Sequence, residues 1–511
     1  MRNSRYVWPG AGLVAGLAGL AVSYGVAMVV AVGNNPVTAV AQSVIKILPG
    51  SLAEQGVQIL GKHDKPVLVG IVLAGLVGLF VVIGKVARRN VGYGVAGFLI
   101  LAGVGLAAIV SAYSFTLHNV LPLVAGYVVW VLALAWLASR LRDRHTPERK
   151  NRRGFLLGAG VMLVASSAVA VAGQAMGAGR QKVEQARRSI KLPHAATEPP
   201  PPPPPAAADV AVWPEGLADW QTSNHDFYRI DTAIVAPAIT PDSWSLRIHG
   251  LVDNPVTLTY QDLLNRPLVR NWMTLNCVSN PVGGSLVGNA YWGGVLLRDI
   301  LDEVGIQPGA DAIKQSSQDG WTCGTPISAM TDPGRQAMLA IAMNGEPLPI
   351  EHGYPVRTVV PGLYGFVSAC KWVTDFEVTR FSNFSAFWTV RGWSEQAPVK
   401  LASRIDTPQY DDQVMAGTIK VGGFAWEQHV GIKAVEVSLD GGPWQEATLG
   451  QHDHIDSWAQ WRIDLDVGPG DHIVRVRAID DTGRVQTGVP AEVAPNGASG
   501  WHTVQFKAVM A

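Results

Sequence analysis

The sequence has 511 residues, of which 48% are hydrophobic, and its 40 Lys and Arg residues balance its 40 Asp and Glu residues. A chain of this length exceeds the usual size of one domain, and its zero net charge excludes a bulk electrostatic attraction to nucleic acid. The three cysteines, Cys277, Cys323 and Cys370, form no Cys-x-x-Cys motif, which excludes a disulfide framework and a zinc site with several cysteine ligands.

Apolar stretches dominate the first 175 residues. Five of them are long enough to cross a bilayer and contain no charged residue: Gly10–Val32, Val67–Gly84, Val91–Ala112, Val120–Ala138 and Gly154–Gly173. Transporters and pumps usually carry ionisable groups inside the membrane, so these stretches indicate an anchor or docking module. Haem between the helices would need paired histidines, whereas the candidate His118 lies in a short loop. We therefore expect an all-α transmembrane module over residues 1–175, in which glycines allow close helix packing, among them Gly12, Gly16, Gly19, Gly75 and Gly78.

The cationic residues of the loops predict the orientation of this module. Arg2, Arg5, the segment 85–89 and the segment 140–153 place positive charge on one side of the membrane, whereas the loops on the opposite side have Lys46, Lys62 and Lys65. Five cations at 180–191 follow the fifth span on that opposite side, which weakens the contrast without reversing it. Because short cytoplasmic loops are enriched in Lys and Arg, the N-terminus is expected in the cytoplasm. Five spans then place the remainder of this multi-pass cell-membrane protein in an extracytoplasmic position.

An arginine pair, Arg152 and Arg153, precedes the fifth apolar stretch. This arrangement resembles a twin-arginine export signal, which carries folded cargo and suits a domain that folds around a cofactor before it crosses the membrane. The pair also fits an ordinary cytoplasmic cluster of positive charge, and both interpretations remain open at this point.

Composition changes twice after the fifth span. Residues 199–205 are seven consecutive prolines, which predict an extended spacer of about 20 Å at ~3.1 Å per residue within a linker over residues 176–208. Such a run is also a ligand for proline-binding modules, which are uncommon outside the cytoplasm.

The soluble part divides into two regions with different secondary-structure patterns. Residues 209–395 alternate short apolar runs with helical stretches, such as a strand at Ser245–Val252 and a helix at Val295–Glu303, and this mixture is typical of an α+β domain. Residues 396–511 show only strand patterns, with alternating apolar residues at 435–439 before an Asp-Gly turn and again at 474–478. We expect this second part to form an immunoglobulin-like β-sandwich.

The candidate chemistry begins in the α+β part. The run RNWMTLNCVSNPVGG delivers Cys277 from a β-prone segment to a loop rich in Asn, Pro and Gly. A thiolate there suits a nucleophile, a soft metal ligand or a small buried side chain. His352 and Arg357 lie in one further stretch of the same part and Lys371 in another, and they supply donors for a phosphate or a heterocycle.

The soluble part contains an ordered set of motifs. They are HDFYRIDT at 225–232, LRIHGLV at 246–252, LNCVSN at 275–280, MNGEPLP at 343–349, HGYPVR at 352–357, VVPG at 359–362 and CKWV at 370–373. From about residue 220 to the C-terminus the sequence therefore resembles the molybdopterin-dependent oxidoreductases of the sulfite oxidase type.

The resemblance implies a role for each matching residue. Cys277 would ligate molybdenum beside the dithiolene of the pterin, and His352, Arg357 and Lys371 would hold the pterin and its phosphate. Arg229 matches an active-site arginine of the family. The part from Pro398 onward resembles the Mo-co oxidoreductase dimerisation domain, which makes a homodimer the implied assembly.

Two departures from the family concern the substrate. Pro281 and Val282 stand where sulfite oxidases have an arginine pair, and Ile341 stands where they have a tyrosine. A pocket without these donors is expected to bind sulfite poorly and to have apolar walls near Ile341 and Trp292.

Two functional hypotheses follow. The first is a membrane-anchored, extracytoplasmic molybdenum oxidoreductase that performs oxygen-atom transfer on a small molecule other than sulfite. Because the sequence has no Cys-x-x-Cys-His haem motif, its electrons would pass to a separate electron-transfer protein or a quinone-linked partner. The second hypothesis is a non-catalytic membrane receptor or scaffold that keeps the fold without the metal, and molybdenum content distinguishes the two.

Overall fold

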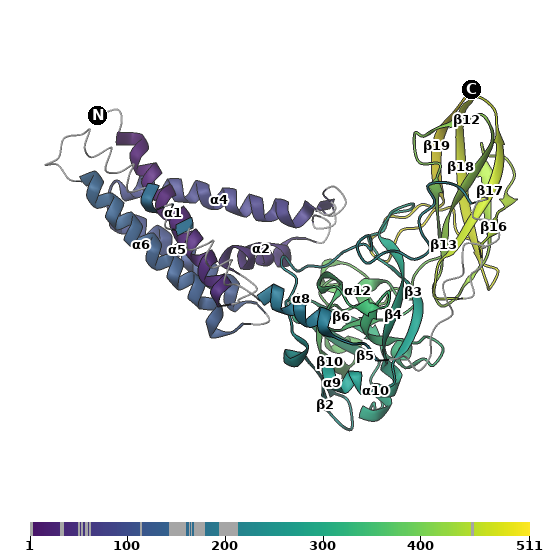
Figure 1. Cartoon of the computed structure of the whole chain (residues 1–511), viewed down its shortest axis with the longest axis horizontal. Coiled ribbons are helices and arrows are strands. Elements are labelled where there is room, and N and C mark those ends of the chain that lie inside the picture. Colours follow the sequence, from purple (N-terminus) through teal and green to yellow (C-terminus); the bar gives the residue numbers. More distant parts are fainter. Residues whose placement is uncertain are drawn as a thin grey trace. The chain divides into compact units, whose positions relative to one another are not determined.

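The computed structural model describes residues 4–30, 35–49, 63–112, 115–142, 179–193, 213–450 and 454–510, with short stretches between 52 and 60 and between 160 and 167. The chain divides into two compact units. The helical unit consists of residues 1–186 and the segment Asp231–Ala238, and the second unit contains the rest (Figure 1).

Five helices make up most of the described part of the helical unit. They are α1 (Ser4–Val29), α2 (Pro36–Ile47), α4 (Asp64–Ala87), α5 (Val91–Val110) and α6 (Leu121–Arg142). Two asparagines start helices: the Asn35 side chain accepts hydrogen bonds from Val37 N and Thr38 N, each at 3.0 Å, and Asn90 accepts one from Gly92 N at 2.9 Å. These side chains satisfy backbone donors that the first helical turn leaves without partners.

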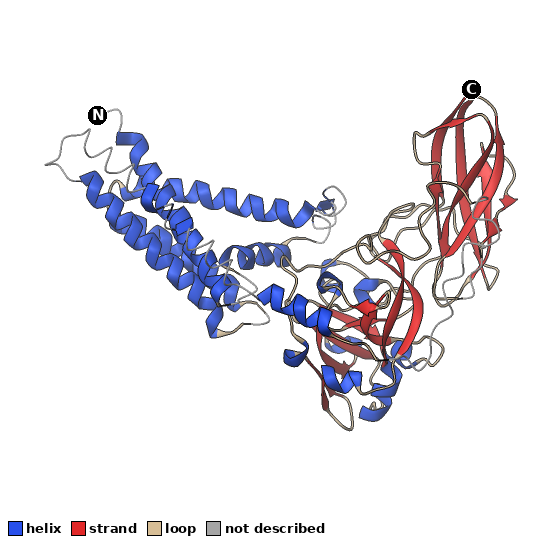
Figure 2. Cartoon of the chain, viewed as in Figure 1, coloured by secondary structure: helices blue, strands red, loops and turns tan. Residues whose placement is uncertain are grey.

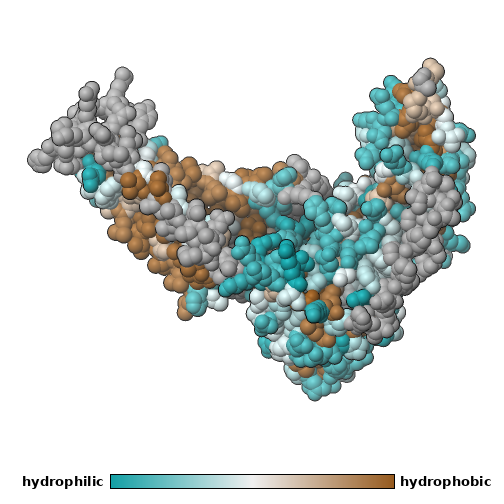
Figure 3. Space-filling view, viewed as in Figure 1, coloured by the Kyte–Doolittle hydropathy of each residue, from teal (hydrophilic) through white to brown (hydrophobic). Residues whose placement is uncertain are grey.

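Four described helices are long and apolar enough to cross a membrane. They are Val7–Val29, Asp64–Ala87, Val91–Val110 and Leu117–Arg142, which confirms the first four expected spans as long apolar helices. Figure 3 shows apolar residues gathered on the surface of the helical unit. The fifth expected span and the pair Arg152–Arg153 lie almost wholly outside the described residues.

The interior of the helical unit is built from aromatic rings and small residues. Trp130 stacks on Phe98 with 5.2 Å between ring centroids and donates a hydrogen bond to Gly16 O at 2.9 Å. A Cβ at Gly12 would lie 2.5 Å from Gly84 N, so these helices approach too closely for a larger residue. The expected role of glycine is therefore met on α1, whereas Gly75 and Gly78 face open space.

The segment expected as a linker contains a helix. Helix α8 covers Gly179–Ser189, and Ile190 and Leu192 pack against the core of the second unit. The residues of α8 are mostly good helix formers, which accounts for a helix in this part of the expected linker. The proline run itself lies outside the described residues.

The α+β region of the second unit contains two sheets (Figure 2). One has the strand order β2-β1-β10-β5-β6, and the other has the order β3-β4-β7-β8 with β9 beside β7. The strands are β1 (Ser245–Gly250), β2 (Val256–Thr259), β3 (Val269–Asn276), β4 (Val287–Leu296), β5 (Ala312–Ser317), β6 (Thr322–Pro326), β7 (Met338–Met343), β8 (Glu346–Pro347), β9 (Arg357–Val359) and β10 (Val373–Thr379). Short helices connect them: α9 (Tyr260–Leu264), α10 (Leu297–Val304), α11 (Ile327–Thr331) and α12 (Gly365–Ser368).

The expected helix at 295–303 begins two residues later than predicted. Val295 and Leu296 belong to β4 and pair with Leu339 and Met338 of β7. Helix α10 then buries Leu297, Ile300, Leu301 and Val304, the spacing of one helical face. Pairing with β7 therefore overrides the local helical pattern at the first two positions.

The C-terminal region is rich in β-sheet. One sheet has the order β11-β13-β17-β16 and the other the order β12-β19-β18-β14-β15. The strands are β11 (Ala402–Thr407), β12 (Gln413–Met415), β13 (Gly417–Trp426), β14 (Ile432–Leu439), β15 (Gln445–Glu446), β16 (Thr448–Leu449), β17 (Ala459–Val467), β18 (Gly470–Asp480) and β19 (His502–Val509). A buried cluster contains apolar residues of both sheets, including Val421, Trp461, Val437 and Val476.

The α+β and C-terminal regions share a hydrophobic core. The large cluster around Trp272, Leu301 and Phe376 also includes Phe424 and Trp458 of the C-terminal strands and their connections. Hydrogen bonds also cross this junction; for example, Trp458 N donates to Thr274 Oγ1 at 2.8 Å. The C-terminal region is therefore fixed against the strand that leads to Cys277.

Candidate active site

Cys277 begins the loop that connects β3 to β4. Cys277 N donates to Leu286 O at 2.9 Å, which closes the loop at its base. Within the loop, the Asn280 side chain accepts a hydrogen bond from Leu286 N at 2.8 Å, and Asn280 N donates to Cys277 O at 3.1 Å. The Cys277 thiol is thus presented by a loop with its own hydrogen bonds, as the sequence predicted, and the residue keeps 9% of its surface exposed.

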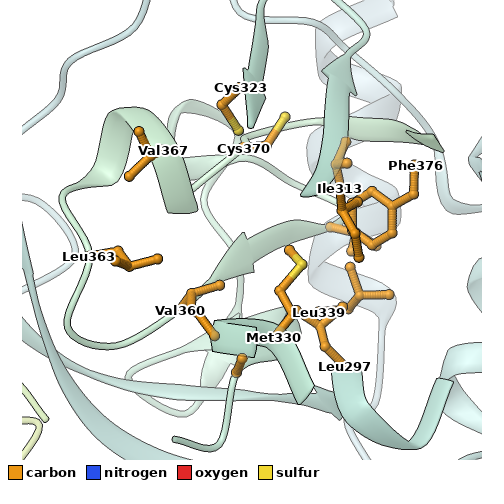
Figure 4. Packing of buried hydrophobic residues seen from close by; sticks show 14 of the residues in the cluster. Leu297, Ile313, Cys323, Met330, Leu339, Val360, Leu363, Val367, Cys370 and Phe376 are labelled. Atoms are coloured by element: carbon orange, nitrogen blue, oxygen red, sulfur yellow. The ribbon is translucent and has the colours of Figure 1, made fainter. Parts of the chain in front are cut away.

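The other two cysteines lie in the core. Cys323 on β6 and Cys370 are both 0% exposed, and Figure 4 shows their side chains turned toward each other among apolar residues. Burial raises the pKa of the Cys370 thiol well above its usual value, and a hydrogen bond with Cys323 raises it further. A thiol that stays protonated is a poor metal ligand, so Cys277 is the best candidate of the three.

His352 and Arg357 lie on either side of a tight turn. The short helix η4 (Ile350–His352) ends at Gly353, whose φ of 106° is readily adopted by glycine. His352 Nε2 lies 3.1 Å from Asn224 O, so this nitrogen carries a proton. Burial, followed by the charges of Lys371, Arg357 and Arg229, lowers the pKa of His352 to about 3. The imidazole is therefore neutral near pH 7 unless an anion joins it.

Arg357 is a buried cation beside an aromatic face. It donates to His352 O at 3.2 Å, Ala369 O at 3.4 Å and Thr358 O at 3.4 Å. Its guanidinium carbon lies 5.1 Å from the centre of the Trp292 ring. Burial lowers its pKa to about 10, so the group remains charged near pH 7 in a site that suits a bound anion.

Lys371 lies close to the same turn. Its Nζ donates to Glu351 O at 3.1 Å and lies 5.2 Å from the centre of the Trp372 ring. A Cβ at Gly353 would lie 3.2 Å from Lys371 Cα and 3.0 Å from Arg357 Cβ. The structure therefore brings His352, Arg357 and Lys371 together around one glycine.

The segment that carries Arg229 is fixed to this cluster by polar and aromatic contacts. Asn344 in the turn after β7 donates to Thr222 O and Asn224 Oδ1, each at 2.9 Å, and accepts from Tyr291 N at 2.9 Å. Phe227 packs edge-to-face against His352, with 5.7 Å between ring centroids. Arg229 is solvent-exposed, and its charge contributes to the low pKa of His352.

Two tyrosines near Cys277 were not predicted from the sequence. Burial, followed by the negative charge of a Cys277 thiolate, raises the pKa of Tyr228 above its usual value. The same two influences act on Tyr364, whose pKa rises to about 12 although a hydrogen bond from Lys400 N at 3.4 Å opposes the shift. Both hydroxyls are therefore protonated, neutral donors. Tyr228 lies inside the HDFYRIDT motif and Tyr364 follows VVPG, so their places beside two site motifs were the available signal.

The positions that depart from the family pattern lie in two environments. Pro281 and Val282 are exposed in the Cys277 loop, so no cation stands there. Ile341 is fully buried in β7 within the main core, and Trp292 is buried against Arg357. Ile341 thus belongs to the core, and the apolar wall near Trp292 stays a prediction.

Among the described residues, no group of three or more His, Cys, Asp and Glu side chains is arranged to hold a metal ion. A metal at Cys277 would therefore have one protein thiolate and take other ligands from a cofactor. Soft thiolate ligation beside a buried cluster of cations suits a metal carried by an anionic organic group.

Two family models match the second unit. Residues 233–388 match the oxidoreductase molybdopterin binding domain, and residues 394–508 match the Mo-co oxidoreductase dimerisation domain. The uncharacterized oxidoreductase YuiH of Bacillus subtilis (strain 168) is 35% identical over 150 residues, which are 29% of this chain and 72% of that protein. The chain belongs to the sulfite oxidase family of molybdopterin oxidoreductases.

Three further proteins are similar to this chain at lower sequence identity. Sulfite oxidase of Arabidopsis thaliana is 28% identical over 302 residues, which cover 48% of this chain and 76% of that protein. Mitochondrial sulfite oxidase of Homo sapiens is 27% identical over 332 residues, which cover 55% of this chain and 60% of the human protein. The sulfane dehydrogenase SoxCD of Paracoccus pantotrophus matches 57% of this chain and 84% of that chain, with 24% identity and a TM-score of 0.49.

Membership in the sulfite oxidase family makes this chain a molybdenum-cofactor-dependent oxidoreductase. The described residues fit that cofactor, because the Cys277 thiol and the buried cation Arg357 both interact with the protonated Tyr228. When bound, the cofactor supplies two-electron redox chemistry and oxygen transfer. The protein supplies the thiolate, the positive charge and the shape of the pocket.

Proposed function

We propose that this chain is a membrane-anchored, extracytoplasmic molybdenum oxidoreductase that transfers an oxygen atom to or from a small molecule other than sulfite. The observation that carries the proposal is the Cys277 loop, which presents the most exposed of three thiols beside Tyr228 and Tyr364. The proposal assigns a role to each residue of this arrangement.

Cys277 is the proposed thiolate ligand of molybdenum and the centre of the reaction. His352, Arg357 and Lys371 are proposed to hold the pterin and its phosphate. Their proximity around Gly353 and the hydrogen bonds of Arg357 to backbone carbonyls support this role. Arg229 is the proposed substrate-side arginine, because it is exposed and its charge influences His352. A bound phosphate would stabilise the protonated form of His352 and raise its low pKa.

The proposed domain division follows the changes in composition and secondary-structure pattern along the chain. A transmembrane module occupies residues 1–175, a linker occupies 176–208, a molybdopterin-binding domain occupies 209–395 and a dimerisation domain occupies 396–511. The two facing sheets of the last domain support an immunoglobulin-like sandwich. Its match to a dimerisation family supports a homodimer.

The membrane part of the proposal rests on the helical unit. Large apolar side chains of α4, α5 and α6 are exposed, for example Ile71, Ile100 and Leu132. Such surfaces suit contact with lipid. The distribution of loop cations supports a cytoplasmic N-terminus and a soluble part outside, where electrons would pass to or from a separate protein or a quinone-linked partner.

The pocket composition favours a neutral substrate. Sulfite carries up to two negative charges and binds best to several charged donors of fixed geometry. Here Pro281 and Val282 replace an arginine pair, and the tyrosine donors near Cys277 are neutral. Each missing charge-assisted hydrogen bond costs about 1.5–3 kcal/mol, so sulfite is expected to bind at least about a hundredfold more weakly than it would with two such donors in place.

A sulfoxide fits these neutral donors. Its reduction consumes two electrons and two protons, breaks the sulfur–oxygen bond and releases a thioether and water. The electrons would come from the external partner, and the tyrosine hydroxyls are the proposed hydrogen-bond donors to the oxygen.

Steady-state assays with artificial electron carriers test this substrate preference. The full-length protein is compared in sulfite oxidation and in sulfoxide reduction, with Tyr364→Phe as the variant that removes one hydroxyl. We expect sulfoxide turnover that Tyr364→Phe reduces about tenfold or more, and weak sulfite turnover. Efficient sulfite oxidation at micromolar concentrations would refute the preference for a neutral substrate.

A further inference from the structure

The C-terminal region contacts the loop that carries Cys277 through an arginine. Arg404 on β11 donates from Nη1 to Gly284 O at 3.1 Å. Gly284 belongs to the stretch between Cys277 and Leu286 that the backbone hydrogen bond at the base of the loop encloses. The guanidinium therefore reaches the loop from another region of the chain.

Neighbouring groups hold the Arg404 guanidinium in one orientation. Asp406 accepts from Nε at 2.6 Å and from Nη2 at 3.3 Å. The guanidinium carbon also lies 5.7 Å from the centre of the Phe424 ring and 6.0 Å from that of Trp458. The Arg404 side chain is only 11% exposed. Because the carboxylate and the rings fix the fork, the donor to Gly284 O has a set direction.

A second contact lies one residue earlier in the loop. Gly283 has a φ of 77°, and a Cβ there would lie 2.1 Å from His502 Nε2, so only glycine fits against this ring. His502 Nδ1 accepts a hydrogen bond from Ile405 N at 3.0 Å. The His502 ring is therefore fixed to the strand that carries Arg404.

These contacts act on a loop that is already closed at its base and tied by Asn280. We propose that Arg404 is a positioning residue of the active site, which fixes the Cys277 loop through Gly284 O and so sets the direction of the Cys277 thiolate. This inference rests on the proposed role of Cys277 as the metal ligand. It makes the C-terminal region a part of the catalytic apparatus in addition to a surface for assembly.

A merely structural role for Arg404 predicts a different outcome. In that case the residue stabilises the junction of the two regions, and its loss lowers the melting temperature without changing the behaviour of Cys277. A positioning role predicts an effect at the thiol itself, including in protein that has lost its cofactor.

The test uses the full-length protein with Arg404→Gln and Arg404→Lys. Lysine keeps a charge near Asp406 but lacks the fork that also reaches Gly284 O. Arg477→Gln is the matched control, because Arg477 also pairs with a carboxylate, Glu436, at 2.6 Å, and lies 4.2 Å from the centre of the Trp444 ring. It lies on β18 and contacts Glu436 and Trp444, which are outside the Cys277 loop.

The first readout is the alkylation rate of Cys277 in cofactor-free protein, resolved from Cys323 and Cys370 by peptide mass spectrometry. Loss of one charge-assisted hydrogen bond corresponds to an increase of about tenfold or more in the equilibrium constant for opening of the loop. We expect Arg404→Gln to raise the alkylation rate by about this factor, Arg404→Lys to give an intermediate rate, and Arg477→Gln to match the wild type.

The second readout is the metal absorption spectrum and the kinetics of the loaded enzyme. Arg404→Gln is expected to shift the thiolate-dependent absorption and lower kcat more than it raises KM. If wild type holds molybdenum but Arg404→Gln matches Arg477→Gln in alkylation rate and spectrum, the positioning role is refuted and the proposed function stands. If no form of the protein retains molybdenum, the proposed function itself fails, and the alkylation result alone then reports on the loop.

Discussion

Asn344 offers a sharp test of how the substrate-side segment is held. Its side chain makes three hydrogen bonds of 2.9 Å, two as donor to Thr222 O and Asn224 Oδ1 and one as acceptor from Tyr291 N. Asn224 O in turn contacts His352 Nε2, and Arg229 follows five residues after Asn224. Loss of the Asn344 side chain should therefore destabilise the domain and loosen the segment that carries Arg229.

The magnitude follows from these bonds and from the backbone. Three neutral hydrogen bonds contribute about 1 kcal/mol each, so Asn344→Gly should cost about 3 kcal/mol. Asn344 has a φ of 52°, a left-handed conformation that costs alanine about 1–2 kcal/mol and costs glycine little. Asn344→Ala should therefore be less stable than Asn344→Gly, by about 1 kcal/mol after the greater entropy of unfolded glycine is counted.

Thermal unfolding of the full-length protein, followed by tryptophan fluorescence, measures both effects. For a domain of this size, a loss of 3 kcal/mol corresponds to a decrease of about 6–12 °C in Tm. Asn344→Asp keeps the acceptor for Tyr291 N but places an oxygen against Thr222 O and Asn224 Oδ1. Its Tm should therefore decrease at least as much as that of Asn344→Gly. A decrease of less than about 2 °C for Asn344→Gly would show that these bonds do not hold the segment.

Two further predictions concern export and pH. If the fifth span is a twin-arginine signal, Arg152→Lys combined with Arg153→Lys should retain the soluble part in the cytoplasm, because the charge is preserved but the arginine pair is lost. A reporter fused after Ala511 that still appears outside would contradict this signal. Burial, followed by the charge of Arg404, lowers the pKa of His502 to about 4 from an ordinary 6.5, so between these values the unfolded chain binds a proton that the folded chain does not. The free energy of unfolding of the wild type, relative to that of His502→Gln, should therefore fall by about 3 kcal/mol as the pH decreases from 6.5 to 4. Parallel Tm profiles of the two proteins over this range would rule out this linkage.

Local patterns in the sequence were sufficient for the elements that carry the main motifs. The β-prone run before Cys277 forms β3, and the alternation at 435–439 lies in β14, which ends before a turn in which Asp440 and Gly441 have φ values of 51° and 74°. At these positions the spacing of apolar residues and the turn residues predict the same secondary structure, and contacts with distant segments do not alter it.

Contacts between distant segments account for what the sequence could not predict. Val295 and Leu296 extend β4 because they pair with β7. Tyr364 and Lys400 meet near the site across 36 residues of sequence, and Arg404 reaches Gly284 across 120. No periodicity or short motif marks such pairs. The first is created by strand pairing within the α+β region, and the other two by the packing of the C-terminal region against it.

The central claim is that Cys277 binds molybdenum as the protein ligand of the cofactor. Metal analysis and the absorption spectrum of purified full-length protein test it most directly, with Cys323→Ser and Cys370→Ser as matched controls. The account predicts that wild type and both controls contain molybdenum with the same spectrum, whereas Cys277→Ser loses activity and changes the spectrum, since a hard hydroxyl replaces a soft thiolate. An unchanged spectrum in Cys277→Ser, together with a spectrum lost in either control, would show that another cysteine holds the metal.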